Sequence, residues 1–315
     1  MGSVFLDAEG LENCQLDELR RVCGGLKMYQ WTASNEISSR IAGAELVILN
    51  KARITREILV ANPTLRLICV VATGTDCVDL QAARELGVTV CNCQAYGTDS
   101  VVQHVFTSIL ALHTSLLRYH GAVRAGRWQK AGQFCFLDFP ITELKGKTLG
   151  IVGFGNLGKG VAAIAEAFGM RVVVAARPGS TDDTRPSLVE ILPLVDVLTL
   201  HCPLNEHTRG LIGIKELAMM KPTAFLVNAA RGGIVDEDAL VEALKNGTIG
   251  GAAVDVLTVE PPKDGNPLLD TELPNLIVTP HVAWASEEAR QRLVDHTVEN
   301  ITAWRAGTGV RVVNN

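Results

Sequence analysis

Short apolar runs alternate with helix-like segments along the first hundred residues. The runs predicted to be strands are Val4–Leu6, Met28–Thr32, Leu46–Leu49, Leu67–Val71 and Val88–Val90. Segments with helical spacing of apolar residues lie between them, at Glu36–Ala42, Thr55–Ala61 and Leu80–Leu86. Strands and helices that alternate in this way are typical of a parallel sheet covered by helices. The first hundred residues are therefore predicted to form a parallel α/β domain.

A second α/β run begins near Lys147. Its predicted strands are Leu149–Val152, Val172–Ala175, Val197–Leu200, Ala224–Asn228, Gly251–Val254 and Leu276–Val278. The residues after Pro280 are too few to form a domain alone, and they read as one helix from about Ser286 to Arg305 plus a tail. We expect this helix to pack on the first domain.

The predicted organisation is therefore a discontinuous substrate domain, residues 1–98 and 285–315, and a dinucleotide-binding domain, residues 99–284. The expected fold class is α/β, with two Rossmann-like doubly wound parallel sheets, the substrate domain being flavodoxin-like. The chain would cross between the domains near residues 98–102 and 282–286. Two such crossings make a hinge, and the active site is expected in the cleft between the domains.

The segment Asp99–Tyr119 is predicted to be one long helix. Its apolar residues cover more than one narrow stripe, so the helix needs burial on several sides. The intramolecular core could supply that burial, and so could a symmetric partner. We favour the second alternative and predict a homodimer through this region.

The glycine-rich segment Thr148–Lys159 indicates where a cofactor binds. A short apolar run ends in Gly153-Phe-Gly155-Asn-Leu-Gly158, and the helical pattern Val161–Phe168 follows. Gly153 permits a tight turn, Gly155 lets the backbone approach a pyrophosphate, and Gly158 lets helix and strand pack closely. The N–H groups at the helix N-terminus attract phosphate. The segment predicts a dinucleotide site.

The end of the next predicted strand bears on the choice between NAD and NADP. NAD sites commonly have an acidic residue here, which bonds the ribose hydroxyls. This chain has Ala176 and then Arg177, so no carboxylate is expected to repel a 2′-phosphate, and the guanidinium could pair with it. We predict that NADPH is accepted. The alternative is an exposed arginine beside an NAD site that tolerates the missing acid.

Composition narrows the class of protein. The chain has 315 residues, 47% of them apolar and 20% charged, with a formal net charge of −5 and no dense basic run. Nucleic acid is therefore not an expected partner. No apolar run is long enough for a membrane span, and no signal peptide is recognised. The eight cysteines include no Cys-x-x-Cys pair, so we expect reduced thiols, a cytoplasmic protein and no metal site.

Three polar residues follow predicted strands whose carboxyl ends should meet at the cofactor. Arg231, Glu260 and His281 come after the strands that begin at Ala224, Gly251 and Leu276. An arginine can hold a carboxylate or carbonyl with its planar fork, and a histidine can exchange a proton near neutral pH. Glu260 would orient the imidazole and favour its charged form. The remaining histidines (His104, His113, His120, His201, His207 and His296) have no such setting and are expected to be structural or exposed.

With these residues in view, the chain resembles the D-isomer-specific 2-hydroxyacid dehydrogenases. The motifs that carry the resemblance are Gly153-Phe-Gly-Asn-Leu-Gly158, His201-Cys-Pro-Leu-Asn-Glu-His-Thr208, Asn228-Ala-Ala-Arg-Gly-Gly-Ile-Val-Asp236, Ala253-Val-Asp-Val-Leu257 with Glu260-Pro, and Thr279-Pro-His281. Four further segments look most like the glycerate dehydrogenase, or hydroxypyruvate reductase, branch. They are Val71-Ala-Thr-Gly-Thr-Asp76, Gln103-His-Val-Phe106, Gly126-Arg-Trp128 and Gly132-Gln-Phe-Cys135.

The resemblance implies a role for each matching position. Arg231, Glu260 and His281 would be catalytic, and the backbone amides of Thr73 and Gly74 would bind the substrate carboxylate. The positions implied to contact the cofactor are Gly153, Gly155, Asn156, Leu157, Gly158, Cys202, Pro203, Thr208, Ala229, Arg231, Asp255 and His281, in addition to Arg177. Asp255 would bond the carboxamide of the nicotinamide. The chain departs from the family at Ala176, where an acid is usual, and at Gln103, where many members have glutamate.

The activity expected from this pattern is the reduction of hydroxypyruvate or glyoxylate with NADH or NADPH, and its reverse. A second interpretation is a reductase for bulkier 2-oxo acids. A third is a dinucleotide-sensing protein of the corepressor kind, which keeps the fold and the cofactor turn without turnover. The intact Arg231, Glu260 and His281 argue against the third interpretation.

Overall fold

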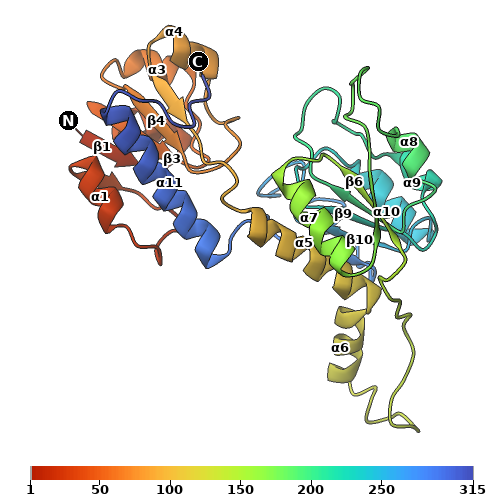
Figure 1. Ribbon diagram of the computed structural model, residues 1–315. Helices are drawn as coiled ribbons and strands as arrows, with labels where there is room; N and C mark the ends of the chain where they lie inside the picture. The colour runs from red at the N-terminus through yellow and green to blue at the C-terminus, as the bar shows by residue number, and fades with distance from the viewer. Residues whose placement is uncertain (1, 315) are drawn as a thin grey trace. The chain divides into compact units, whose positions relative to one another are not determined.

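The computed structural model describes residues 2–314, and it divides into two compact units (Figure 1). The first runs to Gly97 and is completed by the chain from Ala285 onward; we call it the flanking unit. The second, Thr98–Trp284, is the central unit. Both ends of the chain belong to the flanking unit. Each unit has its own parallel sheet and its own apolar core, and each is described by itself.

The flanking unit is built on a parallel sheet of five strands in the order β2-β1-β3-β4-β5. The strands are β1 (Gly2–Phe5), β2 (Leu26–Met28), β3 (Ala44–Leu49), β4 (Leu67–Val70) and β5 (Thr89–Cys91). The central strands β3 and β4 are almost wholly apolar because helices cover both of their faces. This strand order is that of flavodoxin-like sheets, as expected from the sequence.

The helices of the flanking unit are short except for the last one. They are α1 (Asp17–Cys23), the 3₁₀ turn η1 (Ser34–Glu36), α2 (Ile37–Arg40), α3 (Arg56–Ala61), α4 (Leu80–Glu85) and α11 (Glu287–Arg305). The Ser286 side chain caps α11 by accepting a hydrogen bond from the Ala289 N–H. α11 packs against α1 and β4, so the C-terminal helix covers the N-terminal sheet (Figure 1).

The central unit has a parallel sheet of six strands in the order β11-β10-β9-β8-β6-β7. The strands are β6 (Thr148–Val152), β7 (Arg171–Val174), β8 (Val197–Leu200), β9 (Phe225–Asn228), β10 (Gly251–Val254) and β11 (Leu276–Val278). From β6 the chain first moves outward to β7 and then crosses back to β8. The switch point therefore lies between β6 and β8, and the carboxyl ends of the strands beside it are the expected place for a ligand.

The helices of the central unit cover both faces of this sheet. They are α5 (Thr98–His113), α6 (Leu116–Arg124), α7 (Asn156–Ala167), α8 (Leu188–Ile191), α9 (Ile214–Met219) and α10 (Glu237–Lys245). α5 and α7 lie side by side (Figure 1). They approach closely at Gly160, where a Cβ atom would lie only 2.8 Å from the side chain of Val102.

The predicted single helix Asp99–Tyr119 is wrong, because the chain bends by 62° between α5 and α6. Ser115 at the bend has a φ of +50°, and its hydroxyl donates to the Pro140 carbonyl. A non-glycine residue in the left-handed region cannot continue a helix. The apolar residues of α5 that suggested a partner (Val101, Val102, Val105, Phe106 and Ile109) are buried in the core of the central unit itself.

Two further sequence predictions differ from the structure in the flanking unit. The strand expected at Met28–Thr32 lies earlier, at Leu26–Met28, because only those residues pair with β1. Helix α1 had no predicted counterpart, since its seven residues bury only Leu19, Val22 and Cys23 and leave a weak apolar pattern. Among the described residues no single helix is long and apolar enough to cross a membrane. The bent pair of α5 and α6 would be long and apolar enough, judged by length and composition alone.

Candidate active site

The glycine turn at the end of β6 has the geometry that a pyrophosphate requires. Gly153 has a φ of +95°, and a Cβ atom there would lie 2.6 Å from the carbonyl carbon of His201. At Gly158 a Cβ atom would lie 2.2 Å from the carbonyl oxygen of Gly153. Gly155 faces open space, and α7 begins at the next residue with no side chain capping its N-terminus. Among residues 2–314 the N–H groups of Asn156 and Leu157 at this helix end have no partner, and they fit a phosphate ligand.

The loop after β7 contains a carboxylate that the sequence analysis did not place there. One carboxylate oxygen of Asp183 accepts a hydrogen bond from the Arg177 N–H at 2.8 Å. Arg185 pairs with both oxygens of the same carboxylate and holds the pKa of Asp183 well below its usual range. The expectation that no acid lies near this strand end is therefore wrong. The negative charge is paired with Arg185, however, and the exposed Arg177 side chain keeps its own charge available.

The loop after β8 folds against this segment. A Cβ atom at Gly179 would lie 2.5 Å from the ring of His207, so the two loops touch at that point. Thr208 is buried, and its hydroxyl donates to the Pro203 carbonyl at 2.6 Å. Cys202 is also buried, and burial raises the pKa of its thiol to about 11. Cys202 and Thr208 thus shape the loop, while the exposed Pro203 lies on its surface.

Arg231 lies on the loop after β9, and the chain itself holds that loop in shape. Asn228 is buried and bonds the loop twice, through the Arg231 carbonyl at 3.0 Å and the Ala230 N–H at 3.1 Å. The Arg231 guanidinium donates to the Ala230 carbonyl at 2.7 Å and is otherwise unpaired within the described residues. A guanidinium has five N–H groups, so most of them remain for a ligand. Ala229 is half-buried beside this turn.

His281 and Glu260 meet, although 21 positions separate them in the chain. The Nδ1 atom of His281 lies 2.6 Å from Oε2 of Glu260, and Oε1 of Glu260 accepts the Leu257 N–H at 2.9 Å. Their side chains are 28% and 33% exposed. Because a carboxylate only accepts, Nδ1 carries the hydrogen and Nε2 remains for proton exchange with a ligand.

Asp255 at the end of β10 fixes the backbone on both sides of His281. Its side chain is 2% exposed and accepts hydrogen bonds from the N–H groups of Val282 and Ala283, each at 2.9 Å. Its backbone carbonyl accepts the His281 N–H at 2.7 Å. These bonds hold His281 at a φ of +55°, a conformation that a non-glycine residue adopts only under constraint. One carboxylate oxygen still has a lone pair for a further donor.

The structure therefore brings three of the expected site residues of the central unit together. Glu260 and His281 are in contact, and Asp255 bonds the loop that carries His281. Arg231 has no bond to either residue of the pair, although its loop meets the loop before Glu260: a Cβ atom at Gly232 would lie 1.9 Å from the Leu257 carbonyl oxygen. Thr73 and Gly74 belong to the flanking unit.

Thr73 and Gly74 lie on the loop after β4. The Thr73 hydroxyl donates to the Cys93 carbonyl at 2.9 Å, and the Thr73 carbonyl accepts from the Asn92 side chain at 2.7 Å. Within residues 2–314 the backbone N–H groups of Thr73 and Gly74 have no hydrogen-bond partner. Two adjacent free N–H groups on a fixed loop are suited to a carboxylate.

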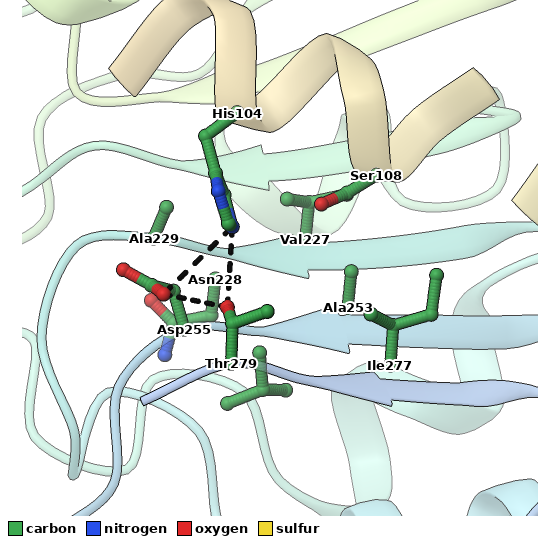
Figure 2. A pocket seen from close by; sticks show the side chains of 10 residues that line it. His104, Ser108, Val227, Asn228, Ala229, Ala253, Asp255, Ile277 and Thr279 are labelled. Atoms are coloured by element: carbon green, nitrogen blue, oxygen red, sulfur yellow. Dashed lines mark hydrogen bonds and ion pairs between the residues drawn. The ribbon is translucent and has the colours of Figure 1, made fainter. Parts of the chain in front are cut away.

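His104 was expected from the sequence to be structural or exposed. In the structure its ring lies over the ends of β10 and β11, 3.2 Å from the Thr279 hydroxyl (Figure 2). Its Nε2 atom is 3.7 Å from the Asp255 carboxylate. Its signals in the sequence were its position on an apolar helix and its place in the segment Gln103-His-Val-Phe106, and neither reveals what the side chain contacts. The described residues contain no cluster of His, Cys, Asp and Glu side chains suited to a metal.

A glycine turn, a switch point and an imidazole–carboxylate pair at the ends of one parallel sheet define the class of protein: a dinucleotide-dependent oxidoreductase. Comparison with known proteins gives the family. The model for the NAD-binding domain of the D-isomer-specific 2-hydroxyacid dehydrogenases matches residues 106–283. The chain belongs to this family, which confirms the resemblance recognised in the sequence, the enzyme class and the nicotinamide cofactor. The family acts on small 2-hydroxy and 2-oxo acids.

Known relatives extend along almost the whole chain. A glycerate dehydrogenase from Methylorubrum extorquens is 49% identical over 90% of this chain and 89% of its own length. A hydroxypyruvate reductase from Blautia hydrogenotrophica is 37% identical over 90% and 89%. The crystal structure of the TT0316 protein from Thermus thermophilus is 35% identical, with a TM-score of 0.87 over 99% of this chain and 100% of that one. These matches confirm the predicted fold class of two parallel α/β domains.

Proposed function

We propose that the protein reduces hydroxypyruvate or glyoxylate with NADH or NADPH, giving D-glycerate or glycolate, and catalyses the reverse oxidation. The hydrogen-bonded pair of His281 and Glu260 carries this proposal, because it supplies a proton donor whose orientation is fixed. The glycerate dehydrogenase and hydroxypyruvate reductase relatives support the choice of substrate. The enzyme class also includes reductases for bulkier 2-oxo acids, and phenylpyruvate tests for these.

In the proposed reaction the nicotinamide, when bound, supplies the hydride. His281 gives the proton on Nε2 to the carbonyl oxygen of the substrate and takes it back in the reverse direction. Glu260 holds the ring through Nδ1 and stabilises the positive charge that the ring carries before it gives up the proton. Arg231 polarises the same carbonyl with its planar guanidinium. The backbone N–H groups of Thr73 and Gly74 bind the substrate carboxylate.

We further propose that the central unit binds the dinucleotide. The pyrophosphate would lie at the N-terminus of α7, and the lone pair left on Asp255 would accept the carboxamide N–H. The other residues proposed to contact the cofactor are Gly153, Gly155, Asn156, Leu157, Gly158, Cys202, Pro203, Thr208 and Ala229, with Arg231 and His281 at the nicotinamide. Arg177 would pair with a 2′-phosphate, so we propose that NADPH is accepted.

A panel of substrates and cofactors tests the proposal. The consumption of NADH and of NADPH is followed with hydroxypyruvate, glyoxylate, pyruvate and phenylpyruvate. We expect the highest kcat/KM with hydroxypyruvate or glyoxylate and measurable rates with both cofactors. A preference for phenylpyruvate would move the enzyme to the bulkier 2-oxo acids. No turnover with any acid, together with tight cofactor binding, would favour a dinucleotide-sensing protein.

We also propose a homodimer, formed by α6 and the segment that follows it rather than by α5. Phe134 and Leu137 are 87% and 80% exposed, and Leu116 and Leu117 are each more than half exposed. Exposed apolar side chains of this kind are suited to contact with a second copy of the same chain. Light scattering at micromolar concentration should give twice the 33.8 kDa of one chain. A single monomeric mass would refute the dimer.

The protein is proposed to act in the cytoplasm, without nucleic acid.

A further inference from the structure

The loop that carries His281 is held by side chains of helix α5. His104 points from α5 toward the ends of β10 and β11, where it meets Thr279 and Asp255 (Figure 2). One turn earlier on the same helix, the Ser100 hydroxyl donates to the Ala283 carbonyl at 2.7 Å. The backbone on both sides of His281 is thus tied to α5.

The direction of each hydrogen bond in this group follows from the chemistry of its members. The Thr279 hydroxyl lies 2.5 Å from Oδ1 of Asp255, and a carboxylate cannot donate, so the hydroxyl hydrogen points to Asp255. The Thr279 oxygen is then free only to accept from His104. The Nε2 atom of His104 must therefore carry a hydrogen and donate it across the 3.2 Å contact. A chain of donors runs from His104 through Thr279 to Asp255.

Asp255 in turn restricts the backbone around His281 through its own hydrogen bonds. Its Oδ1 atom, which accepts from Thr279, also accepts the Val282 N–H, and Oδ2 accepts the Ala283 N–H. Its backbone carbonyl accepts the N–H of His281 itself. The group is half-buried or buried throughout, the side chains of His104 and Asp255 being 22% and 2% exposed. Hydrogen bonds to a charged group in such surroundings are stronger than those between neutral groups.

We propose that His104 is a positioning residue for the reaction: through Thr279 and Asp255 it fixes the carboxylate that holds His281 in its left-handed conformation. The inference rests on the proposed role of His281. Without the His104 donor, the Thr279 hydroxyl and the Asp255 carboxylate can rotate, and the loop gains freedom to leave a φ of +55°. The Nε2 atom of His281 then spends less time in the position for proton transfer, and small displacements of this kind slow reactions strongly.

The variants are chosen to separate a positioning role from a structural one. His104→Ala removes the donor, whereas His104→Gln keeps an N–H group near the position of Nε2. Thr279→Val removes the hydroxyl that His104 contacts, and Thr279→Ser keeps it. Thr107→Ala is the matched control, because Thr107 lies one turn along α5 and is exposed.

We expect His104→Ala to lower kcat about tenfold while KM for the 2-oxo acid and the Kd of the reduced cofactor change less than about twofold. His104→Gln and Thr279→Ser should keep most of the activity, and Thr107→Ala all of it. The double variant His104→Ala with Thr279→Val should be no slower than the slower single variant, because both break one chain of bonds. Unchanged kcat in His104→Ala, or fully additive losses, would overturn the proposal.

A second measurement does not depend on the substrate. The proton that His281 shares with Glu260 should give a downfield NMR resonance, assigned by its loss in Glu260→Gln. We expect that resonance to broaden or shift in His104→Ala and to return in His104→Gln. An unchanged resonance would contradict the positioning role even if no 2-oxo acid were turned over. If the resonance changes in a protein that reduces none of the four acids, the proposed reaction is wrong. The positioning of His281 by His104 is then still supported.

Discussion

The imidazole of His281 and the carboxylate of Glu260 are joined by a 2.6 Å hydrogen bond between Nδ1 and Oε2. The bond settles which ring nitrogen meets a ligand, because the hydrogen on Nδ1 is committed to Glu260. The second oxygen of Glu260 is tied to the Leu257 N–H, so the carboxylate cannot turn away from the ring. A proton donor held in this way suits a reaction in which the proton must reach one particular oxygen.

The N–H groups that the Arg231 guanidinium has left for a ligand lead to the first prediction. Arg231→Lys keeps the positive charge but loses the planar fork, so kcat/KM for the 2-oxo acid should fall about 10²-fold, or about 2.7 kcal/mol of transition-state stabilisation. Cofactor binding should change little. Steady-state kinetics with Arg209→Lys, a change at an exposed arginine of the same unit, provide the control. Equal kcat/KM in the two variants would show that Arg231 does not touch the substrate.

The parallel sheets could be predicted from the sequence because their strands are short, apolar and buried on both faces. β8, β10 and β11 lie where the pattern placed them. The bend after α5 could not be predicted. It depends on the Ser115 hydroxyl reaching Pro140, a contact between residues 25 positions apart that leaves no local signal.

In the candidate site, too, the contacts that leave no local pattern could not be predicted. Arg231, Glu260 and His281 were identified because each follows a strand whose carboxyl end faces the ligand side of a sheet. Asp183 and His104 were missed because their importance lies in contacts that no periodic pattern or motif records. Asp183 reaches back six positions to Arg177, and His104 meets residues more than 150 positions away. Spacing along the chain reports neither contact.

The second prediction concerns the choice of cofactor. Arg177→Ala should lower kcat/KM for NADPH about tenfold or more and leave the value for NADH nearly unchanged, because only NADP carries the 2′-phosphate. Arg171→Ala is the matched control, since Arg171 is exposed at the opposite end of β7. The ratio of the two kcat/KM values decides the outcome. If the ratio is the same in Arg177→Ala and in the wild type, this arginine does not bind the 2′-phosphate.

The third prediction concerns stability at low pH. His113 is buried against Thr142, and burial, together with nearby Lys147, lowers its pKa from 6.5 to about 4. Between these values the unfolded chain binds a proton that the folded chain does not, so the free energy of unfolding falls as the pH drops from 6.5 to 4. The full effect is about 3 kcal/mol.

Urea unfolding of the wild type and of His113→Asn across this pH range measures that contribution. Asparagine can keep the bond to Thr142 but does not titrate, so the variant should lose less stability as the pH falls, whatever it loses at pH 7. The carboxylates titrate in both proteins and cancel in the comparison. Identical slopes of stability against pH would show that His113 is protonated as easily in the folded chain as in the unfolded one.

His281 is the group that moves the proton in the proposed reaction, and one pair of measurements tests this role most directly. Turnover of hydroxypyruvate and the Kd of the reduced cofactor are compared in the wild type, His281→Ala and His281→Asn; asparagine tolerates the φ of +55° and so controls for the backbone. Both variants should lose about 10³-fold in kcat while the Kd stays within about threefold. Near-normal turnover in either variant would contradict the central claim.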